Sequence, residues 1–569
     1  MTPLWGPLRI DPETVRFRLW APDRKAVALE IDDGSRIAMQ SDAEGWFSVD
    51  AKAAPGCRYR FRLEENLAVA DPASRLQHGG VHGWSVLGNA GSYAWSCADW
   101  AGRPWHEAVI QEVHAGVLGG FDGVAERLAA LADLGVTALQ VMPIAAFAGT
   151  RNWGYDGVLP FAVTEAYGSP DALRSLIDQA HAHGLMVMLD VVYNHFGPDG
   201  NYLGAYAKGF FDEHADTPWG GAVAVSKPAV RRFFIENALM WLRDYRFDGL
   251  RFDAVHAIAD NAFLDEMARE IRAALPGRHI HLVLENENND ADRLAPGLYD
   301  AQWNDDFHNV LHVLLTGETD AYYAGFASDP TARLARCLSE GFIYQGETPP
   351  GESAHPRGTP SAHLPTTRFV SFLQNHDQIG NRAMGERLTV LADHDRLRAA
   401  TALLLLSPQI PLIFMGDEDG STSPFLFFTD FTDDLAEAVR EGRRREFASF
   451  TAFADPEARA AIPDPNAPDT FQASTPEPGV DAVIWCAFYR DLLAIRRRSI
   501  VPRLADARGR SAEVLGKGAV CARWAMGDGA TLTIAVNLGD GIVRFPAIDD
   551  PLFALGNAGA PGSFAAGLA

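Results

Sequence analysis

The chain has few cysteines, and their placement excludes two classes of protein. Five cysteines occur among 569 residues, and no two of them have the C-x-x-C spacing. They are Cys57, Cys97, Cys337, Cys486 and Cys521. An odd, scattered set argues against a disulfide framework and against a structural zinc site. A reducing cytoplasm is therefore the expected location.

The chain also lacks a basic excess and a long apolar run. Its 49 basic and 74 acidic residues give a net charge of −25, which disfavours nucleic acid and anionic membranes as partners and fits a neutral substrate. The longest apolar stretch, residues 403–416, is short and contains two prolines, so it is not a membrane span. The first residues show no basic segment followed by an apolar one, so no secretory signal is expected.

Residues 1 to about 98 have the pattern of an all-β domain. Short alternating segments, separated by Asp-Gly, Gly and Pro turn signals, are VRFRLWAP (15–22), AVALEI (26–31), GWFSVD (45–50) and CRYRFRL (57–63). Alternation of apolar and polar residues places one face of each strand in a core. We therefore expect an N-terminal β-sandwich domain over residues 1–98.

From about residue 105, apolar strand-like runs alternate with amphipathic helical runs. The strand-like runs are 108–116, 138–143, 185–192, 247–255, 280–285, a weak one at 300–305, 369–375 and 410–416. The helical patterns include 121–135, 171–184 and 227–245. Eight β/α units form a closed parallel barrel, and nearly continuous apolar strands are typical of strands that helices cover. The sequence predicts an α/β fold with a catalytic (β/α)8 TIM barrel over residues 99–500.

The segments around the end of the barrel give weaker signals. Residues 348–366 and 462–480 are rich in turn-forming residues without periodicity, so we interpret both as extended loops. The helical pattern at 486–498 is expected to close the barrel.

A small C-terminal β domain is expected over residues 501–569. Residues 519–526 and 531–539 alternate like strands. The stretch after about residue 540 is rich in Ala and Gly, so we expect it to be disordered or weakly packed.

Polar residues interrupt the third predicted strand at its carboxyl end, where barrel enzymes hold their chemistry. The strand ends LMVMLDVVYNH, so Asp190 lies within the apolar run, and Asn194 and His195 follow it. Asp190 and Asn194 are both compatible with a structural role, holding loops by hydrogen bonds, and we favour that role for Asp190. His195 lies beyond the strand and is placed to touch a ligand.

The fourth strand carries Arg251 and Asp253 two positions apart, so their side chains share a face. A buried Arg beside a carboxylate favours its ionised form, which a carboxylate nucleophile needs. A structural ion pair explains the same spacing equally well.

The fifth strand ends in Glu285 after mostly apolar residues. Desolvation at such a position raises the pKa of a carboxyl group, as a general acid requires. Glu287 shares the face but lies further into the loop, so it is the rival candidate.

The seventh strand delivers Asn375, His376, Asp377 and Gln378 after an apolar run, an arrangement that a core role does not explain. Glycoside hydrolysis needs one carboxylate and one carboxylic acid across the scissile bond. Candidate carboxyl groups at three strand ends supply both.

Four short motifs resemble, in order, those of the α-amylase family of glycoside hydrolases. They are DVVYNH (190–195), GLRFDAVH (249–256), LVLEN (282–286) and FLQNHD (372–377). The resemblance covers the N-terminal β domain, the barrel and the start of the tail. The sequence departs from the family at MGDED (415–419), where Met-Gly-Glu-Glu is usual, and in the residues before Glu285.

The resemblance implies a retaining, double-displacement mechanism. Asp253 would be the nucleophile, Glu285 the acid/base and Asp377 the transition-state stabiliser. The residues implied to bind substrate are Tyr155, His195, Arg251, His256, Asn304, Asp305, Asp306, His376 and Gln378. Trp153, Tyr155 and Trp303 lie in strand-end loops where they could stack on sugars. The long acidic insertion that holds calcium in secreted amylases is missing after His195, so we expect no metal and no cofactor.

Within that family the loops are most similar to those of trehalose-releasing hydrolases, notably over 153–203, 298–318 and 424–450. This likeness implies cleavage of the α-1,4 bond next to the trehalose end of maltooligosyl trehalose, and a metabolic pairing with a maltooligosyl trehalose synthase. Two alternatives stay open. One is a 1,4-α-glucan branching enzyme, which passes its glycosyl group to a glucan chain instead of water, and the other is an inactive glycan-binding relative.

Overall fold

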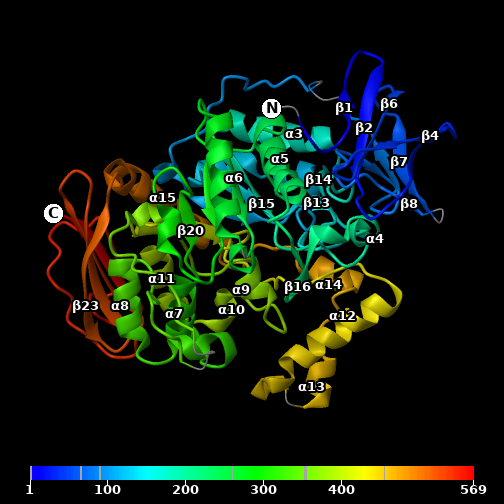
Figure 1. Cartoon of the computed structure of the whole chain (residues 1–569). Coiled ribbons are helices and arrows are strands. Elements are labelled where there is room, and N and C mark those ends of the chain that lie inside the picture. The colour runs from blue at the N-terminus through cyan, green and yellow to red at the C-terminus, as the bar shows by residue number, and fades with distance from the viewer. Residues whose placement is uncertain are drawn as a thin grey trace.

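The computed structural model describes residues 3–64, 67–88, 91, 93–258, 260–350, 355–453 and 455–569. In Figure 1 the chain forms three parts: blue strands at the upper right, a central barrel wrapped by helices, and an orange and red sheet at the left. No helix of the described residues is long and apolar enough to cross a membrane. The domain boundaries at residues 98 and 500 stay predictions.

Two antiparallel sheets make up the N-terminal part. The first consists of β1 (Leu8–Arg9), β2 (Thr14–Trp20), β6 (Trp46–Lys52) and β5 (Gln40–Ser41). The second consists of β4 (Arg36–Ala38), β3 (Val27–Ile31), β7 (Arg58–Leu63), β10 (Trp84–Val86) and β9 (Gln77–His78), with β8 (Ala68–Val69) paired to β7. Phe17 of the first sheet packs on Tyr59 of the second, with ring centroids 4.8 Å apart. The predicted N-terminal β-sandwich is confirmed.

Eight parallel strands close into the central barrel. They are β11 (Ile110–Val113), β12 (Ala138–Val141), β15 (Met186–Val191), β18 (Gly249–Phe252), β19 (His281–Leu284), β20 (Ala301–Trp303), β21 (Phe369–Phe372) and β22 (Ile410–Phe414). The first strand pairs with the last, with Glu112 opposite Phe414, which completes the ring. All eight predicted strands are present, including the weak one at 300–305, and the predicted barrel is confirmed.

The interior of the barrel is apolar along most of its length. Buried side chains that point inward include Ile110, Ala138, Met186, Met188, Val283, Ala301, Trp303, Val370, Phe372, Ile410 and Leu412. Since side chains two apart on a strand share a face, the residues that follow Ile110 and Met188 by two also point inward, nearer the mouth. These residues are Glu112 and Asp190.

Helices cover the outside of the barrel (Figure 1). They include α1 (Gly120–Ala125), α2 (Leu128–Leu134), α3 (Pro170–Ala182), α5 (Pro228–Asp244), α6 (Asn261–Ala274), α7 (Asp305–Thr316), α8 (Pro330–Glu340), α11 (His394–Leu406) and α15 (Ala482–Ile495). The start of α3 follows local chemistry: Ser169 accepts a hydrogen bond from the Ala172 amide, and Pro170 occupies the first turn, where its missing N–H costs nothing. The single helix expected at 121–135 is two short ones, α1 and α2.

Several connections carry more structure than the sequence indicated. The stretch 462–480 contains a short helix, α14 (Pro468–Ala473), so its interpretation as an extended loop was wrong. Pro468 at the first position of that helix is a start signal that the surrounding turn-forming residues mask. A hairpin of β16 (Phe211–Thr217) and β17 (Gly220–Val223) was not foreseen. In the predicted loop 348–366, residues 351–354 lie outside the described residues.

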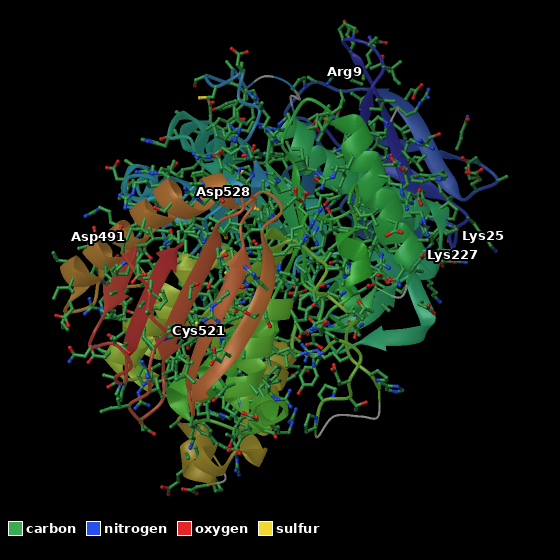
Figure 2. The ribbon with its side chains drawn as sticks, turned by 90° about the vertical axis from the view of Figure 1, so that its left-hand side faces the viewer. Arg9, Lys25, Lys227, Asp491, Cys521 and Asp528 are labelled. Atoms are coloured by element: carbon green, nitrogen blue, oxygen red, sulfur yellow. The ribbon has the colours of Figure 1, made fainter. Side chains whose placement is uncertain are left out.

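The C-terminal part is a five-stranded antiparallel sheet. Its strands, in spatial order, are β23 (Arg508–Gly516), β24 (Ala519–Ala525), β25 (Thr531–Asn537), β27 (Ser563–Leu568) and β26 (Phe553–Leu555). Figure 2 looks onto this sheet, with Cys521 labelled on it, and shows helices behind it. The sheet packs on α8 and α11.

The expectation that the tail after about residue 540 is disordered or weakly packed was wrong. Strand β27 pairs with β25 on one side and β26 on the other, and Phe564 is buried. The small residues reflect close packing: a Cβ at Gly567 would lie 2.4 Å from Ile548. Ala and Gly are needed here because neighbouring groups approach the strand closely, and composition alone does not distinguish this from disorder.

Candidate active site

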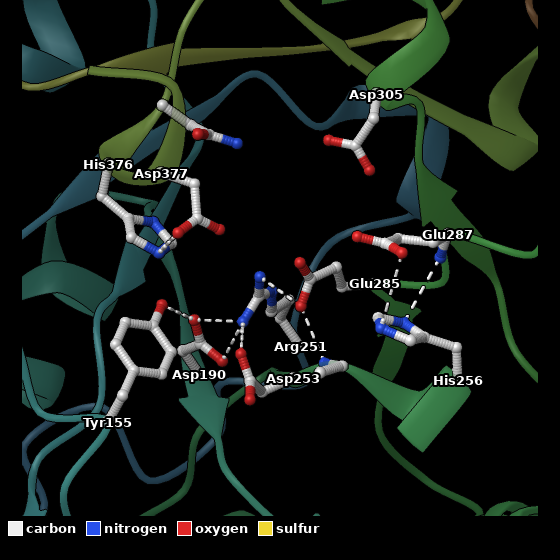
Figure 3. A network of polar contacts seen from close by, with 12 residues as sticks. Tyr155, Asp190, Arg251, Asp253, His256, Glu285, Glu287, Asp305, His376 and Asp377 are labelled. Atoms are coloured by element: carbon white, nitrogen blue, oxygen red, sulfur yellow. Dashed lines mark hydrogen bonds and ion pairs between the residues drawn. The ribbon is translucent and has the colours of Figure 1, made fainter. Parts of the chain in front are cut away.

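Arg251 lies at the centre of the polar groups in the barrel mouth (Figure 3). Its side chain is fully buried, and its Nη1 donates to both oxygens of Asp190 at 2.8 Å and to Oδ1 of Asp253 at 2.9 Å. Its Nη2 lies 2.9 Å from Oε2 of Glu285, an ion-pair contact that lacks the alignment of a hydrogen bond. The guanidinium stands over the ring of Trp303, 4.2 Å from its centroid. The shared face predicted for Arg251 and Asp253 is present, and it is part of a larger network.

Asp253 is held on both sides but stays open to the cavity. Its Oδ1 accepts from Arg251, and its Oδ2 accepts from the Asn194 side-chain amide at 2.8 Å. The side chain keeps 12% of its surface exposed. Asn194, for which the sequence left a structural role open, therefore contacts the predicted nucleophile directly. His195 follows Asn194 in the chain, and its ring stacks on Trp219 of the β16–β17 hairpin, with ring centroids 5.7 Å apart.

Glu285 occupies a site that disfavours its charge. Burial raises the pKa of its carboxyl group well above the usual value, and the neighbouring carboxylates of Asp253 and Asp377 add to this although Arg251 opposes it. Its Oε2 accepts the backbone N–H of Ala254 at 2.7 Å. Ala254 has a φ of 41°, in the left-handed region that non-glycine residues rarely adopt. This strained backbone turns the N–H toward Glu285, as expected where structure around a site imposes an unfavourable conformation.

Asp377 lies across the cavity from Glu285 and Asp305 (Figure 3). Burial opposes its ionisation, but His376 and Arg251 outweigh burial and lower its pKa. His376 Nε2 lies 3.4 Å from Oδ1 of Asp377, and the Asn381 amide donates to the same oxygen at 3.3 Å. Asp377 is thus held as a carboxylate where Glu285 is held as an acid.

Tyr155 and Asp190 form the floor beside these groups. The Tyr155 hydroxyl donates to Asp190 Oδ2 at 2.7 Å, and the Tyr155 ring stacks on His376 with centroids 5.1 Å apart. Burial raises the pKa of Asp190 to about 6, with Arg251 opposing it. The predicted structural role of Asp190 agrees with these contacts, because every oxygen of this buried carboxylate is bound by protein.

Three further predicted residues, His256, Asp305 and Gln378, make contacts around the site. His256 contacts Glu287, whose Oε2 lies 3.8 Å from the ring Nε2 (Figure 3). The Gln378 amide donates to Asp305 Oδ1 at 3.4 Å. Burial raises the pKa of Asp305 to about 7. Glu287 is exposed, so it lacks the desolvated surroundings that Glu285 has.

Asn304 and Asp306 are bound by protein instead of facing the cavity. The Asn304 amide donates to the Gly341 carbonyl at 3.0 Å. Asp306 accepts from the amides of Ile343 and Tyr344 at 2.7 and 3.2 Å. Both side chains are fully buried, and their predicted sugar contacts stay predictions.

The two tryptophans considered for sugar stacking are core residues. Trp303 is buried in the barrel below Arg251. Trp153 is buried against Phe425, with stacked rings 5.4 Å apart, and its indole donates to the Leu426 carbonyl. The expectation that they stack on sugars was wrong, because Trp303 belongs to strand β20 and points into the barrel, and the Trp153 ring is buried against neighbouring aromatic side chains.

A buried carboxylate on β11 completes the site. Glu112 accepts the backbone N–H of His376 at 2.9 Å, and its other oxygen lies 2.7 Å from the ring Nδ1. Glu112 was not predicted from the sequence. The signal that could have found it is a charged residue near the carboxyl end of a barrel strand, as at Asp190, although the neighbouring Gln111 makes this strand less uniformly apolar.

Comparisons with known proteins agree with this geometry. A family model described as the alpha amylase catalytic domain matches residues 92–216, and one described as a domain of unknown function matches residues 507–568. The crystal structure of a Salmonella typhimurium protein, described as a candidate alpha amylase, is 44% identical, covers 100% of both chains and has a TM-score of 0.95. A pullulanase from Paenibacillus barengoltzii, 19% identical with a TM-score of 0.68 over 99% of this chain and 95% of its own, shares the fold.

Curated relatives narrow the assignment. Malto-oligosyltrehalose trehalohydrolase from Deinococcus radiodurans is 42% identical over 85% of this chain and 81% of its own. The enzyme of the same name from Saccharolobus solfataricus is 39% identical over 86% of each chain.

The barrel, the carboxyl groups at its mouth and these matches define a glycoside hydrolase of the α-amylase class. Within that class, the chain belongs to the malto-oligosyltrehalose trehalohydrolase family.

Proposed function

We propose that this protein hydrolyses the α-1,4-glucosidic bond next to the trehalose end of maltooligosyl trehalose, with retention of configuration. The observation that carries the mechanism is the contact of one guanidinium, that of Arg251, with both Asp253 and Glu285 at 2.9 Å. Retaining enzymes hold their two carboxyl groups about 5 Å apart, whereas inverting enzymes need roughly 6.5–9.5 Å to admit a water. Two carboxyl groups gripped by one guanidinium support the shorter separation.

In the first step Asp253 attacks the anomeric carbon of the glucose before the trehalose unit. Glu285 gives its proton to the glycosidic oxygen, trehalose leaves, and a β-glycosyl ester forms on Asp253. The different surroundings of the two groups support these roles. Burial keeps Glu285 protonated, and Arg251 and Asn194 stabilise charge on Asp253.

In the second step Glu285, now a carboxylate, takes a proton from water, which attacks the same carbon. The ester breaks, Asp253 regains its charge, and a maltooligosaccharide of retained α configuration leaves. Asp377 stabilises the positive charge that develops on the sugar in both transition states. Its lowered pKa, with His376 as neighbour, supports this role.

The proposed substrate-binding residues fall into two groups. Tyr155, His195, Arg251 and His376 surround the sugar whose bond breaks, and His256, Asp305 and Gln378 contact the sugars beyond it. Asn304 and Asp306 are also proposed to contact these sugars, while the Asn304 side-chain N–H and Asp306 Oδ2 bind backbone groups of the 341–344 segment and so hold the start of α7 in place.

The choice of maltooligosyl trehalose as substrate is supported by the names of the relatives that cover most of the chain. A maltooligosyl trehalose synthase would supply this substrate, so a metabolic pairing is part of the proposal. The five free, scattered cysteines fit a cytoplasmic setting.

The test is a comparison of two substrates, maltooligosyl trehalose and the plain maltooligosaccharide of equal length. We expect rapid release of free trehalose from the first and slow hydrolysis of the second, measured by chromatography of the products. Branched glucan among the products would instead indicate a branching enzyme. One 1,4-alpha-glucan branching enzyme is 27% identical over 71% of this chain. No turnover of either substrate would indicate a glycan-binding protein.

A further inference from the structure

Glu112 has no part in the two chemical steps above, yet its side chain is more deeply buried than those of the catalytic carboxyl groups. It lies on β11, inside the barrel, and its side chain is fully buried. Both its oxygens contact one residue, His376, through the backbone N–H and the ring Nδ1. A buried carboxylate is costly unless it is paired, so this arrangement needs a compensating charge or donor.

The geometry fixes where the protons of His376 lie. Because Oε1 of Glu112 lies 2.7 Å from Nδ1, the ring must carry a proton on Nδ1. Its Nε2 faces Oδ1 of Asp377 at 3.4 Å. A neutral ring would then turn a lone pair toward the Asp377 carboxylate. Only the imidazolium presents a donor to each carboxylate.

The groups around the His376 ring add no second positive charge beside the imidazolium. Tyr155 stacks on the ring, and Trp153 meets its edge. Other titratable or charged groups that influence this cluster come from the neighbouring strands and loops and are His114, Asp190, Arg251 and Asp417. Burial lowers the pKa of His114 to about 4, so it adds no second positive charge. Burial works against the charge on His376, but Asp377 and Glu112 outweigh it and raise the pKa of the ring well above its usual value.

We propose that Glu112 is a positioning residue that keeps His376 doubly protonated, so that the ring holds Asp377 as an oriented carboxylate. The catalytic consequence rests on the proposed function. Asp377 must stay ionised while Glu285, in the same cavity, stays protonated. A fixed positive charge on His376 favours the ionised form of Asp377 but not that of Glu285, which lies further away. The charge therefore keeps Asp377 ionised while Glu285 stays protonated.

The variant that tests this is Glu112→Gln, which keeps the shape but loses the charge. We expect the ring of His376 to lose its second proton at least one pH unit lower than in the wild type. The alkaline limb of the kcat profile, which Glu285 sets in the wild type, should move down to the lower pKa of the ring, because the active form then disappears as the ring becomes neutral. At neutral pH we expect kcat to fall roughly ten- to a hundredfold, more than KM rises.

A matched control separates this effect from a structural one. Glu236 is also a buried carboxylate with two backbone donors, the amides of Leu4 and Trp5 at 2.8 and 3.0 Å, and it lies outside the site. Glu236→Gln should lower the melting temperature and leave the pH profile of kcat unchanged. A uniform loss in Glu112→Gln without a displaced limb would assign Glu112 a purely structural role and overturn the proposal.

A second measurement does not depend on turnover. The His376 ring is followed by NMR in protein labelled at histidine Cε1, with His376→Asn used to assign its signal. Its titration should move to lower pH in Glu112→Gln, and by less in Glu112→Asp, which keeps the charge one methylene further away. If Glu112→Gln does not fold, Glu112→Asp carries the test, and a ring titration identical to the wild type overturns the proposal. Absence of trehalose release by the wild type would refute the proposed function and leave this measurement valid.

Discussion

At the residue scale, several carboxyl groups lie close together in the site, so they cannot all be ionised at once. Asp190, Asp253 and Glu285 all contact Arg251, and three negative charges around one guanidinium would repel one another. Burial resolves this by raising the pKa of Glu285, so that it stays protonated. The same feature that relieves the repulsion provides the acid that the chemistry needs.

This distribution predicts how a Glu285→Gln variant fails. Turnover of maltooligosyl trehalose should fall by roughly 10²–10⁴-fold, because the trehalose oxygen would leave without a proton. A fluoride donor, whose leaving group needs no proton, should still form the glycosyl ester on Asp253, detectable by intact-protein mass spectrometry. Glu287→Gln serves as the control and should keep most of the activity. If Glu287→Gln fails in the same manner and Glu285→Gln does not, the acid role belongs to Glu287.

The pH dependence follows from the same group. Glu285 works as an acid only while protonated, and its raised pKa keeps it protonated above the usual range of a carboxyl group. Activity should therefore persist through mildly acidic pH and decline as the pH rises through the raised value.

Contacts between residues close together in the sequence were predictable at this scale, whereas contacts between residues far apart in the sequence were not. Arg251 and Asp253 were predicted to share a face because they lie two apart on one strand. Glu112 and His376 are 264 positions apart, and only closure of the barrel brings β11 and the end of β21 into one site. Asn304 and Asp306 lie at the start of α7, where the sequence cannot tell a buried side chain from an exposed one.

At the scale of elements, the strands of the barrel were predictable because each is short, apolar and bounded by helical patterns. The ordered tail was not predictable, because the Ala and Gly residues that allow close packing there are also typical of segments that do not pack. Strand β27 lies inside its sheet, with β25 and β26 on its two sides. Its buried Phe564 meets Phe553 of β26, with ring centroids 6.2 Å apart.

The position of β27 predicts that the tail contributes to stability. Phe564→Ala should lower the free energy of unfolding by about 3–5 kcal/mol, the usual cost of removing a buried aromatic ring. Phe553→Ala, on the half-buried edge strand, is the matched control and should cost less. Urea unfolding of both variants measures the difference. Equal, small effects would mean that the end of the chain is as weakly packed as its composition indicates.

At the scale of the whole molecule, the net charge of −25 reflects an excess of acidic groups, so their ionisation affects how stability depends on pH. Burial raises the pKa of seven carboxyl groups among the described residues, and two of these are Asp156 and Glu285. Those raised to about 6 are Asp71, Asp190 and Asp417. Those raised to about 7 are Asp305 and Glu418. Other carboxyl groups act in the opposite sense: Arg60 and Arg62 outweigh burial and lower the pKa of Glu30 to about 2, and His312 and Arg382 lower that of Glu318 to about 2.

These directions fix the sign of the pH dependence. Between about pH 4, where carboxyl groups ionise in the unfolded chain, and pH 7, the carboxyl groups with a raised pKa bind more protons in the folded protein, so the stability that they contribute falls as the pH rises. Buried histidines such as His114 and His308, whose pKa burial lowers to about 4 and about 3, act in the opposite sense and offset part of this fall. Below about pH 4.5 the stability that Glu30 and Glu318 contribute is lost as they become protonated. Repulsion among the excess acidic groups also grows toward neutral pH. We therefore expect a stability maximum at about pH 5, near the isoelectric point of about 5.0.

Calorimetry across pH 4 to 8 tests this expectation, with Glu418→Gln as the informative variant. Glu418 is buried, and its Oε2 accepts the Gly416 amide at 3.0 Å, a bond that the Gln oxygen can keep. The wild type should melt several degrees lower at pH 8 than at pH 5. Glu418→Gln should flatten that decline, because it removes one group that must ionise while buried. Glu13→Gln, at an exposed pair with Lys52, is the control and should keep the wild-type slope. A melting temperature that rises from pH 5 to pH 8 would mean that these carboxyl groups gain partners on ionising, and that charge repulsion does not limit the stability of this molecule.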